Sequence, residues 1–253
     1  MREILSLQNE QIKNDRLLQE KKVRDNKGLF VVEGIKLILE AEKNGFSIER
    51  VYVDGEQLEK YQDDLNLLNN VDIIKTTAII IEKLCDAKSH QGILAVCKKR
   101  QSSIQNSHNR SLILENLQDP KNVGSLLRTA AATSFVDVFL IDCADPYSQK
   151  CVRASMSGIF KVNLNFVSLD ECFDRLLDCQ ILCGDMSGEN LFDAEIQSEN
   201  VAIAVGNEGN GVSENLKNKS NKTVKIPMDN DLESLNVAVS GSVLMYEIKR
   251  RNK

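Results

Sequence analysis

The strongest constraint on the fold is an apolar run that leads into three glycines. Residues 201–205 read Val-Ala-Ile-Ala-Val, and Gly206, Gly209 and Gly211 follow. An unbroken apolar run of this length is typical of a parallel strand buried on both faces. Glycines tolerate positive φ and allow the backbone to approach a ligand closely. Because ligands of open α/β sheets bind beyond the carboxyl ends of strands, we expect a ligand-binding loop at residues 206–211.

The charge of this loop restricts the ligand. Its spacing is not the G-x-G-x-x-G of dinucleotide-binding folds, and no Lys-Ser/Thr pair follows as in a P-loop. Glu208 lies inside the loop, and its carboxylate would repel a pyrophosphate. The loop therefore suits a ligand with little negative charge or one that carries a cation. An ordinary turn, with glycines required only for its geometry, is the alternative.

Two further stretches carry a specific resemblance. Residues 119–130 read Asp-Pro-Lys-Asn-Val-Gly-Ser-Leu-Leu-Arg-Thr-Ala. Residues 226–228 read Ile-Pro-Met, and residues 233–238 read Glu-Ser-Leu-Asn-Val-Ala. Together with residues 201–211, and in this order, they resemble the motifs of the SpoU/TrmH branch of the SPOUT RNA ribose 2′-O-methyltransferases. Each stretch alone is a weak signal, but the ordered set is specific.

The alternation of strand and helix patterns predicts a layered α/β protein. Strands are expected at residues 29–34, 48–53, 71–74, 93–97, 112–114, 136–141, 162–167, 181–183, 201–205 and 224–226. Helices are expected at residues 35–44, 78–84, 123–133, 170–178, 213–218 and 236–249. The polar stretch from Lys98 to Arg110 has almost no apolar residue and is the best candidate for a domain boundary.

The resemblance adds a more detailed architecture. It implies a C-terminal SPOUT domain with a parallel sheet and a deep trefoil knot, which is a rare exception to unknotted chains. It also implies a small N-terminal α/β RNA-binding domain similar to ribosomal proteins. The stretches Phe30–Gly34 and Ser89–Ile93 resemble parts of that domain. The predicted domains are residues 1–100 for substrate binding with a helical lead-in, 101–110 as linker, and 111–253 for methyl transfer.

The resemblance further implies the cofactor and the site. Methyl would pass from S-adenosylmethionine to a ribose 2′-hydroxyl of structured RNA. Catalytic roles fall on Asn122, Arg128, Glu208, Ser234 and Asn236. Cofactor contacts fall on Gly206, Asn207, Gly209, Ile226, Met228 and Leu235. Arg128 would either activate the hydroxyl or clamp the substrate phosphate, and a guanidinium scarcely deprotonates in proteins.

Simpler roles exist for the same residues. Asn122, Ser234 and Asn236 lie near expected helix starts, where asparagine and serine commonly act as N-caps. Arg128 is expected near a helix N-terminus, where the helix dipole disfavours a cation, so a salt bridge or an ordinary surface charge is the simple explanation for it.

The totals limit the class of protein. The net charge of −5 argues against a general nucleic-acid binder but leaves room for a local basic patch. No apolar run approaches the roughly 20 residues that span a bilayer. No secretory signal is visible, so we expect a cytoplasmic protein with no membrane partner. Seven cysteines without a C-x-x-C pair, and only two histidines, give no zinc-site spacing, so we expect reduced thiols and no metal.

Three other functions are weighed against the methyltransferase. They are a non-catalytic RNA-binding or ribosome-assembly factor on the same scaffold, a nucleotide-binding oxidoreductase, and a methyltransferase that acts on a base nitrogen. A binding module would not need Asn122, Arg128, Glu208 and Asn236 together. By resemblance the expected partners are RNA, ribosomal (23S-type) rather than transfer RNA, and a second copy of the chain through the C-terminal domain.

Overall fold

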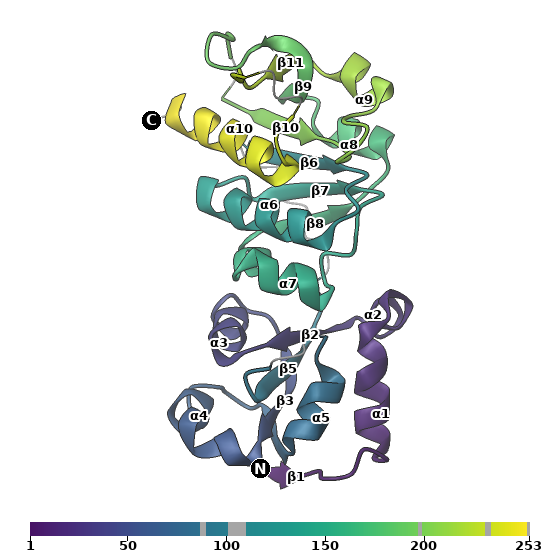
Figure 1. The fold of residues 1–253 in the computed structure, drawn as a ribbon, viewed down its shortest axis with the longest axis vertical. Coiled ribbons are helices and arrows are strands. Elements are labelled where there is room, and N and C mark those ends of the chain that lie inside the picture. The colour runs from purple at the N-terminus through teal and green to yellow at the C-terminus, as the bar shows by residue number, and fades with distance from the viewer. Residues whose placement is uncertain (87–89, 101–109, 197–198, 231–233, 252–253) are drawn as a thin grey trace. The chain divides into compact units, whose positions relative to one another are not determined.

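The computed structural model describes residues 1–86, 90–100, 110–196, 199–230 and 234–251. The chain forms two compact units, each with its own sheet (Figure 1). The first unit comprises Met1–Gln101 and Asp145–Phe160, and the second comprises Ser102–Ala144 and Lys161–Lys253.

The first unit is built around a five-stranded sheet of order β1-β4-β3-β5-β2. Its strands are β1 (Arg2–Glu3), β2 (Leu29–Glu33), β3 (Ile48–Asp54), β4 (Asp72–Thr76) and β5 (Ile93–Lys98). Its helices are α1 (Glu10–Arg16), α2 (Lys21–Lys27), α3 (Ile35–Lys43), α4 (Leu58–Leu65), α5 (Ala78–Leu84) and α7 (Gln149–Ser155). The sheet is mixed, because β5 pairs antiparallel with β2 and β3 whereas β4 pairs parallel with β1 and β3.

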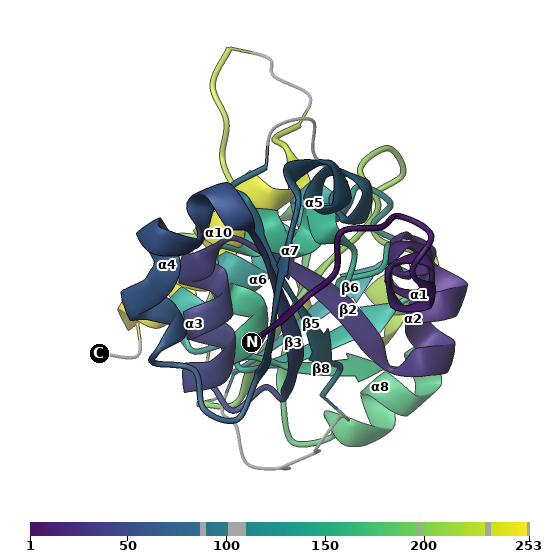
Figure 2. The same cartoon turned by 90° about the horizontal axis from the view of Figure 1, so that it is seen from below.

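Strand alternation divides the apolar side chains of this sheet between two helical layers. Val31 and Tyr52 belong to a buried cluster with residues of α1 and α5. The ring of Phe30 lies against Phe46 and Tyr147, with ring centroids 6.1 and 4.8 Å apart. Figures 1 and 2 show α3 and α4 on one side of the strands and α1, α2 and α5 on the other. This is the three-layer α/β arrangement that the sequence predicts.

The segment Asp145–Phe160 belongs to this first unit, although it falls within the predicted methyl-transfer domain, 111–253. Its helix α7 packs against β2. Arg153 on α7 forms an ion pair with Glu33 at the end of β2, at 3.0 Å. The core of the first unit is therefore completed by residues far along the chain.

A buried ion pair fixes the beginning of this segment. Arg24 Nη2 lies 2.5 Å from Asp145 Oδ2, and the two side chains are only 6% and 7% exposed. Arg24 Nη1 also donates to the carbonyls of Leu18 and Gln19. Burying two charges is costly unless the geometry and the additional hydrogen bonds compensate. Loss of either side chain would therefore leave the other charge buried without its counter-ion.

The sequence boundaries at residues 1–100, 101–110 and 111–253 stay a proposal. The predicted linker lies outside the described residues except for Arg110, which begins the first strand of the second unit. Ser89 and Glu233 of the motif stretches also lie outside the described residues.

The second unit contains a six-stranded sheet of order β11-β9-β10-β6-β7-β8, and its described strands pair parallel with their neighbours. Its strands are β6 (Arg110–Glu115), β7 (Asp137–Ile141), β8 (Asn163–Phe166), β9 (Gln180–Asn190), β10 (Val201–Val205) and β11 (Lys222–Lys225). Its helices are α6 (Pro120–Thr133), α8 (Leu169–Arg175), α9 (Glu214–Lys219) and α10 (Val237–Arg251). Every residue of β10 is buried, which confirms that the apolar run forms a central strand. The trefoil knot stays a prediction.

Helices α6 and α10 pack closely on one another. A Cβ atom at Gly241 of α10 would lie 2.5 Å from Leu126 Cδ2 of α6, so a larger residue there would displace the Leu126 side chain. Thr129 and Ser242 share a hydrogen bond of 2.8 Å across the same interface. The small residues of the last helix thus serve its close packing against α6.

The predicted elements are present, with ends shifted by a few residues. The structure adds β1, α4 and α7, which the sequence patterns do not predict. Helix α6 begins earlier than expected, because Asp119 is its N-cap and accepts a hydrogen bond from the Lys121 amide. Pro120 follows at the first helical position, which suits its fixed φ. The N-cap role considered for Asn122 is therefore wrong, and Arg128 lies well inside the helix rather than at its start.

Candidate active site

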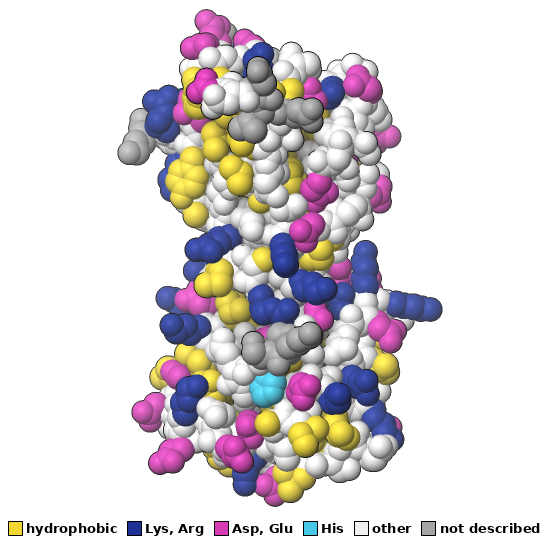
Figure 3. Space-filling view, viewed as in Figure 1, with side chains coloured by type: hydrophobic (Ala, Val, Ile, Leu, Met, Phe, Trp, Pro, Cys, Tyr) yellow, Lys and Arg dark blue, Asp and Glu magenta, His cyan; other side chains and the backbone are white. Residues whose placement is uncertain are grey.

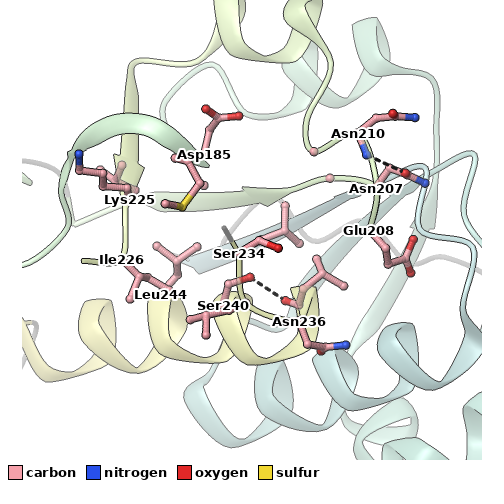
Figure 4. A pocket seen from close by; sticks show the side chains of 18 of the residues that line it. Asp185, Asn207, Glu208, Asn210, Lys225, Ile226, Ser234, Asn236, Ser240 and Leu244 are labelled. Carbon is pink, nitrogen blue, oxygen red and sulfur yellow. Dashed lines mark hydrogen bonds between the residues drawn. The ribbon is translucent and has the colours of Figure 1, made fainter. Parts of the chain in front are cut away.

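A cavity of about 490 Å³ opens in the second unit between the glycine loop and the start of α10. This donor cavity is lined by Gly184, Asp185, Met186, Val205, Gly206, Asn207, Glu208, Gly209, Asn210, Gly211, Val224, Lys225, Ile226, Met228, Ser234, Leu235, Asn236, Val237, Ser240 and Leu244. Figure 4 shows Asn207, Glu208 and Asn210 at one side of it and Lys225 and Ile226 at the other. The structure therefore brings together all six predicted cofactor-binding residues and three of the five predicted catalytic residues.

The glycine loop is a tight turn closed on itself. Asn207 and Gly211 exchange backbone hydrogen bonds of 2.8 and 2.9 Å. Of the three glycines, only Gly211 adopts a positive φ, of 69°. Gly206 is required for a different reason, because a Cβ there would lie 2.2 Å from the carbonyl oxygen of Gly211. The returning chain passes too close for any side chain.

Three polar side chains from three elements form a chain at the rim of the donor cavity. Asn122 Nδ2 donates to Glu208 Oε1 at 3.1 Å, and Asn236 Nδ2 donates to Asn122 Oδ1 at 3.1 Å. Asn122 comes from the first turn of α6, Glu208 from the glycine loop and Asn236 from the start of α10. The stretches that carried the resemblance thus meet at one place.

Glu208 is held as a carboxylate. Its oxygens also accept from the backbone amides of Gln118 and Asp119, at 3.3 and 3.2 Å. Burial raises the pKa of Glu208, but the hydrogen bonds from Asn122 and these amides outweigh it and hold the pKa below its usual value. The site therefore keeps a fixed negative charge at neutral pH.

Asn236 serves two roles at once. Its Oδ1 accepts from the backbone amides of Ala238 and Val239, at 2.9 and 3.4 Å, which caps the first turn of α10. Its Nδ2 is thereby aimed at Asn122. Ser234 lies two residues earlier, exposed on the cavity wall. The capping interpretation of Asn236 is confirmed, and it is compatible with a site role.

Arg128 is placed differently from the other predicted catalytic residues. It is exposed on α6 and does not line the donor cavity. With the other residues that the structure describes it makes no hydrogen bond or ion pair, so the simple salt-bridge explanation finds no support there. Its guanidinium is open to a ligand.

The donor cavity fits S-adenosylmethionine in size and chemistry. Its volume falls within the 300–1,000 Å³ typical of small-molecule sites. Val205, Leu235 and Leu244 supply apolar wall, while backbone of the glycine loop supplies polar groups. The carboxylates of Asp185 and Glu208 at the wall suit a ligand with cationic sulfonium and ammonium groups.

Asp185 is a wall residue that sequence reasoning missed. Its Oδ2 pairs with Lys217 at 2.8 Å, and its Oδ1 accepts from the amide and hydroxyl of Ser187. Burial raises the pKa of Asp185, but the hydrogen bonds from Lys217 and Ser187 lower it by more. The pKa of Asp185 therefore lies below its usual value. No motif spacing marks Asp185; only its place after a predicted strand could have suggested it.

We expect Gly206→Ala to weaken binding of S-adenosylmethionine. The added methyl would force the two strands of the loop apart at Gly211. Overpacking of this kind costs about 1–3 kcal/mol, which corresponds to roughly five- to a hundredfold in affinity. Gly209→Ala in the same loop should weaken binding less, because its Cβ would meet only Asn207 Oδ1, at an ordinary 3.5 Å. Equal calorimetric affinities for the two variants would contradict the role given to Gly206.

The cysteines and the possible metal ligands form no reactive or metal-binding cluster in the part of the chain that the structure describes. All seven cysteines are free, and burial raises the pKa of the Cys97 thiol to about 12. No group of three or more His, Cys, Asp or Glu side chains there is arranged to hold a metal ion. None of the described helices is long and apolar enough to cross a bilayer.

Comparison with known proteins agrees with this geometry. The model of the SpoU rRNA Methylase family matches residues 109–246, and that of the MRM3-like substrate binding domain matches residues 9–95. The chain is 28% identical to the 23S rRNA (guanosine(2553)-2′-O)-methyltransferase RlmP of Bacillus subtilis (strain 168). That alignment spans 252 residues, 98% of this chain and 100% of the relative.

Solved structures show the same fold. A crystal structure of an RNA 2′-O ribose methyltransferase is 27% identical, with a TM-score of 0.86, and the match covers 100% of this chain and 99% of that one. An AdoMet-bound rRNA methyltransferase from Sinorhizobium meliloti is 24% identical, with a TM-score of 0.87 over 98% of this chain and 97% of that one. The family model spans more than half of the sequence, and its region contains the whole donor cavity. The resemblance read from the sequence is thereby confirmed: the chain belongs to the SpoU rRNA methylase family.

Proposed function

We propose that this protein transfers a methyl group from S-adenosylmethionine to a ribose 2′-hydroxyl of ribosomal RNA of the 23S type. The observation that carries the proposal is the Glu208–Asn122–Asn236 chain at the rim of the donor cavity. The Bacillus subtilis relative, similar along its whole length, bears the name of such an enzyme. A ribosomal RNA substrate places the reaction in the cytoplasm.

The chain's own residues position the acceptor and manage charge. When bound, S-adenosylmethionine supplies an electrophilic methyl group on a sulfonium. Ser234 and Asn236 present polar groups to the ribose at the cavity rim, and Leu235 packs against the donor. Asn122 keeps Asn236 and Glu208 in fixed orientation, so little reorganisation accompanies the reaction. The 2′-oxygen would bond to the methyl carbon as the carbon–sulfur bond breaks and its electron pair stays on sulfur, and the hydroxyl proton would leave to water.

Arg128 acts as an electrostatic clamp in this proposal. A guanidinium is a poor base, because it scarcely gives up its proton in proteins. Its planar donors instead suit a phosphate of the RNA backbone and the developing negative charge on the 2′-oxygen. The exposure of Arg128 on α6 supports a partner from outside the chain.

The first unit supplies the RNA-binding surface. Residues 9–95 match a family described as a substrate binding domain. Within this unit, Lys and Arg side chains gather over α7 (Figure 3). Lys150 of α7 is exposed, and Arg153 is oriented by its ion pair with Glu33. Such local positive charge binds phosphates even though the whole chain is acidic.

A second copy of the chain covers the outer face of α10. Val239 and Tyr246 on this helix are 50% and 54% exposed, and Phe192 beside Tyr246 is 50% exposed. Figure 3 shows hydrophobic side chains gathered at the surface over α10. Exposed apolar clusters of this kind mark protein contacts. Tyr246→Asp should shift sedimentation from dimer to monomer, and a wild-type monomer at micromolar concentration would refute the dimer.

The function is tested with labelled methyl donor. Wild-type protein is incubated with 23S, 16S and transfer RNA that lack modification, and the RNA is then digested and the label mapped. Label on one ribose 2′-oxygen of 23S RNA is the expected result. Label on a base nitrogen would overturn the chemistry, and label only in transfer RNA would overturn the substrate. No label, with no calorimetric binding of the donor, would favour a non-catalytic RNA-binding factor.

A further inference from the structure

A second cavity, of about 300 Å³, lies across the glycine loop from the donor cavity. The two cavities share Asn207, Asn210 and Gly211 and otherwise have different walls. This base cavity, as we call it, is lined by Glu115, Asn116, Ile141, Asp142, Asn207, Asn210, Gly211, Val212 and Ser213. We propose that it receives the base of the target nucleotide and that Asp142 selects guanine there. The inference rests on the proposed RNA methyl transfer.

The base cavity lies where α/β sheets bind ligands. It sits at the carboxyl ends of β6, β7 and β10. Strands β10 and β6 are neighbours although they are far apart in sequence, so the strand order reverses at this point. Asn116 and Asp142 follow β6 and β7 directly and both adopt left-handed backbone, with φ of 55° and 50°. Such conformations in non-glycine residues are concentrated at functional sites.

Hydrogen bonds within the protein hold several wall residues of the base cavity in place. The carboxylate of Glu115 accepts from the Ser213 amide at 2.8 Å and from its hydroxyl at 2.6 Å. Gln118 Nε2 donates to Asn116 Oδ1 at 2.7 Å and to the Asp142 carbonyl at 3.1 Å. Glu115 is therefore committed to the wall, and the side chain of Asp142 is the carboxylate left to face a ligand.

The open groups define the ligand's chemistry. Asp142 is exposed, and its carboxylate has no hydrogen bond or ion pair with the other residues that the structure describes. The lining holds two carboxylates, three asparagine amides and no Lys or Arg, so it repels phosphate and favours N–H donors. Ile141 and Val212 give it an apolar part against which a planar ring packs.

Guanine matches this set better than the other RNA bases. Its Watson–Crick edge carries two neighbouring N–H donors, at N1 and the 2-amino group, beside a carbonyl oxygen. The two oxygens of a carboxylate accept from both donors in parallel, which is the geometry of the strong bidentate pairs. Asn116 and Asn210 line the same cavity, and their amides would donate to the carbonyl oxygen. Uracil, cytosine and adenine each lack the paired donors.

The position of the loop connects base recognition to methyl transfer. Asn207 Nδ2 donates to the Asn116 carbonyl on the side of the base cavity, at 2.9 Å. The next residue, Glu208, reaches Asn122 at the rim of the donor cavity. A nucleotide whose base is turned out of its stack into the base cavity would hold its ribose at this rim. The residue beside the base cavity and the residue that contacts Asn122 are thus consecutive in the loop.

The test uses RNA that differs only at the target base. The methylated nucleotide is first mapped with wild-type protein. RNA fragments carrying guanosine, inosine or adenosine at that position are then compared, because inosine lacks only the 2-amino group. For wild type we expect kcat/KM to fall roughly tenfold on inosine and further on adenosine. Asp142→Asn keeps the size and tolerates left-handed backbone, and it should lose roughly ten- to a hundredfold on guanosine.

The decisive quantity is the ratio of guanosine to inosine rates. Asp142→Asn should bring this ratio close to one, whereas Asp174→Asn, an exposed acid on α8 outside both cavities, should preserve it. Donor affinity by calorimetry should be unchanged in both variants. A target other than guanosine, or an equal loss on guanosine and inosine, would overturn the assignment while methyl transfer stands. Failure of wild type to label any RNA would instead refute the proposed function, and the base assignment with it.

Discussion

Arg128→Ala should abolish most methyl transfer and leave binding of S-adenosylmethionine intact. Removing one preorganised donor that faces developing charge typically lowers kcat by about a hundred- to a thousandfold. Arg128 does not line the donor cavity, so calorimetric donor affinity should stay at the wild-type value. Single-turnover transfer to the mapped RNA, with donor in excess, measures the loss directly. Wild-type turnover in this variant would remove Arg128 from the mechanism.

Two further variants separate the possible roles of Arg128. Arg128→Lys keeps the charge at neutral pH but loses the planar pair of donors, so a clamp predicts a partial loss that deepens as the lysine loses its charge toward about pH 10. A base role predicts the opposite, because lysine deprotonates more readily and its rate should rise toward pH 10. Arg175→Ala, on the exposed surface of α8, is the matched control for loss of a positive charge. Its turnover should equal that of wild type.

The second large effect concerns stability of the first unit. Asp145→Ala leaves the Arg24 guanidinium buried without its counter-ion, since both side chains are less than a tenth exposed. Breaking one partner of a buried pair costs about 3–5 kcal/mol of unfolding free energy. Calorimetry should show the melting temperature lowered by on the order of 10 °C. Asp170→Ala, which removes a pair with Lys219 at the surface, should cost less than about 1 kcal/mol.

A double-mutant cycle identifies the cause of this loss. Arg24→Met combined with Asp145→Ala removes both buried charges and leaves none unpaired. Its unfolding free energy should therefore lie closer to wild type than the sum of the two single losses predicts. If the double mutant instead loses the full sum of the two single losses, the loss of stability comes mainly from packing and not from the unpaired charge. The same pair means that deleting residues 1–100 is a poor test of RNA binding, because it would also strip Asp145–Phe160 of its core.

Much of the fold could be predicted because local pattern and burial coincide. The run 201–205 is apolar at every position, and it forms a strand buried on both faces. Helix α4, Leu-Glu-Lys-Tyr-Gln-Asp-Asp-Leu, escaped prediction because only Tyr61 and Leu65 of its residues are buried. Helix α7 escaped because its partners, β2 and Glu33, lie more than a hundred residues earlier. No local pattern reports such contacts.

The site was predictable to the level of its motifs. Asn122, Glu208 and Asn236 follow from the resemblance, and the structure joins them by hydrogen bonds that no spacing specifies. Asp142 and Asp185 could not be found in this way, because a single acid after a strand is common and carries no motif. What distinguishes them is the wall on which each side chain lies, and this depends on strand order.

The inserted segment Asp145–Phe160 also constrains how the polypeptide becomes a protein during synthesis. Translation delivers residues 1–101 first, yet their core is incomplete until Tyr147 and Phe160 have been made. By then the residues of β6, α6 and β7 of the second unit have been synthesised, whereas those of β8 to β11 have not. Domains of most proteins fold one after another from the N-terminus. Here the two units must instead mature in overlapping order, and the earliest-made strands remain open to chaperones for longer.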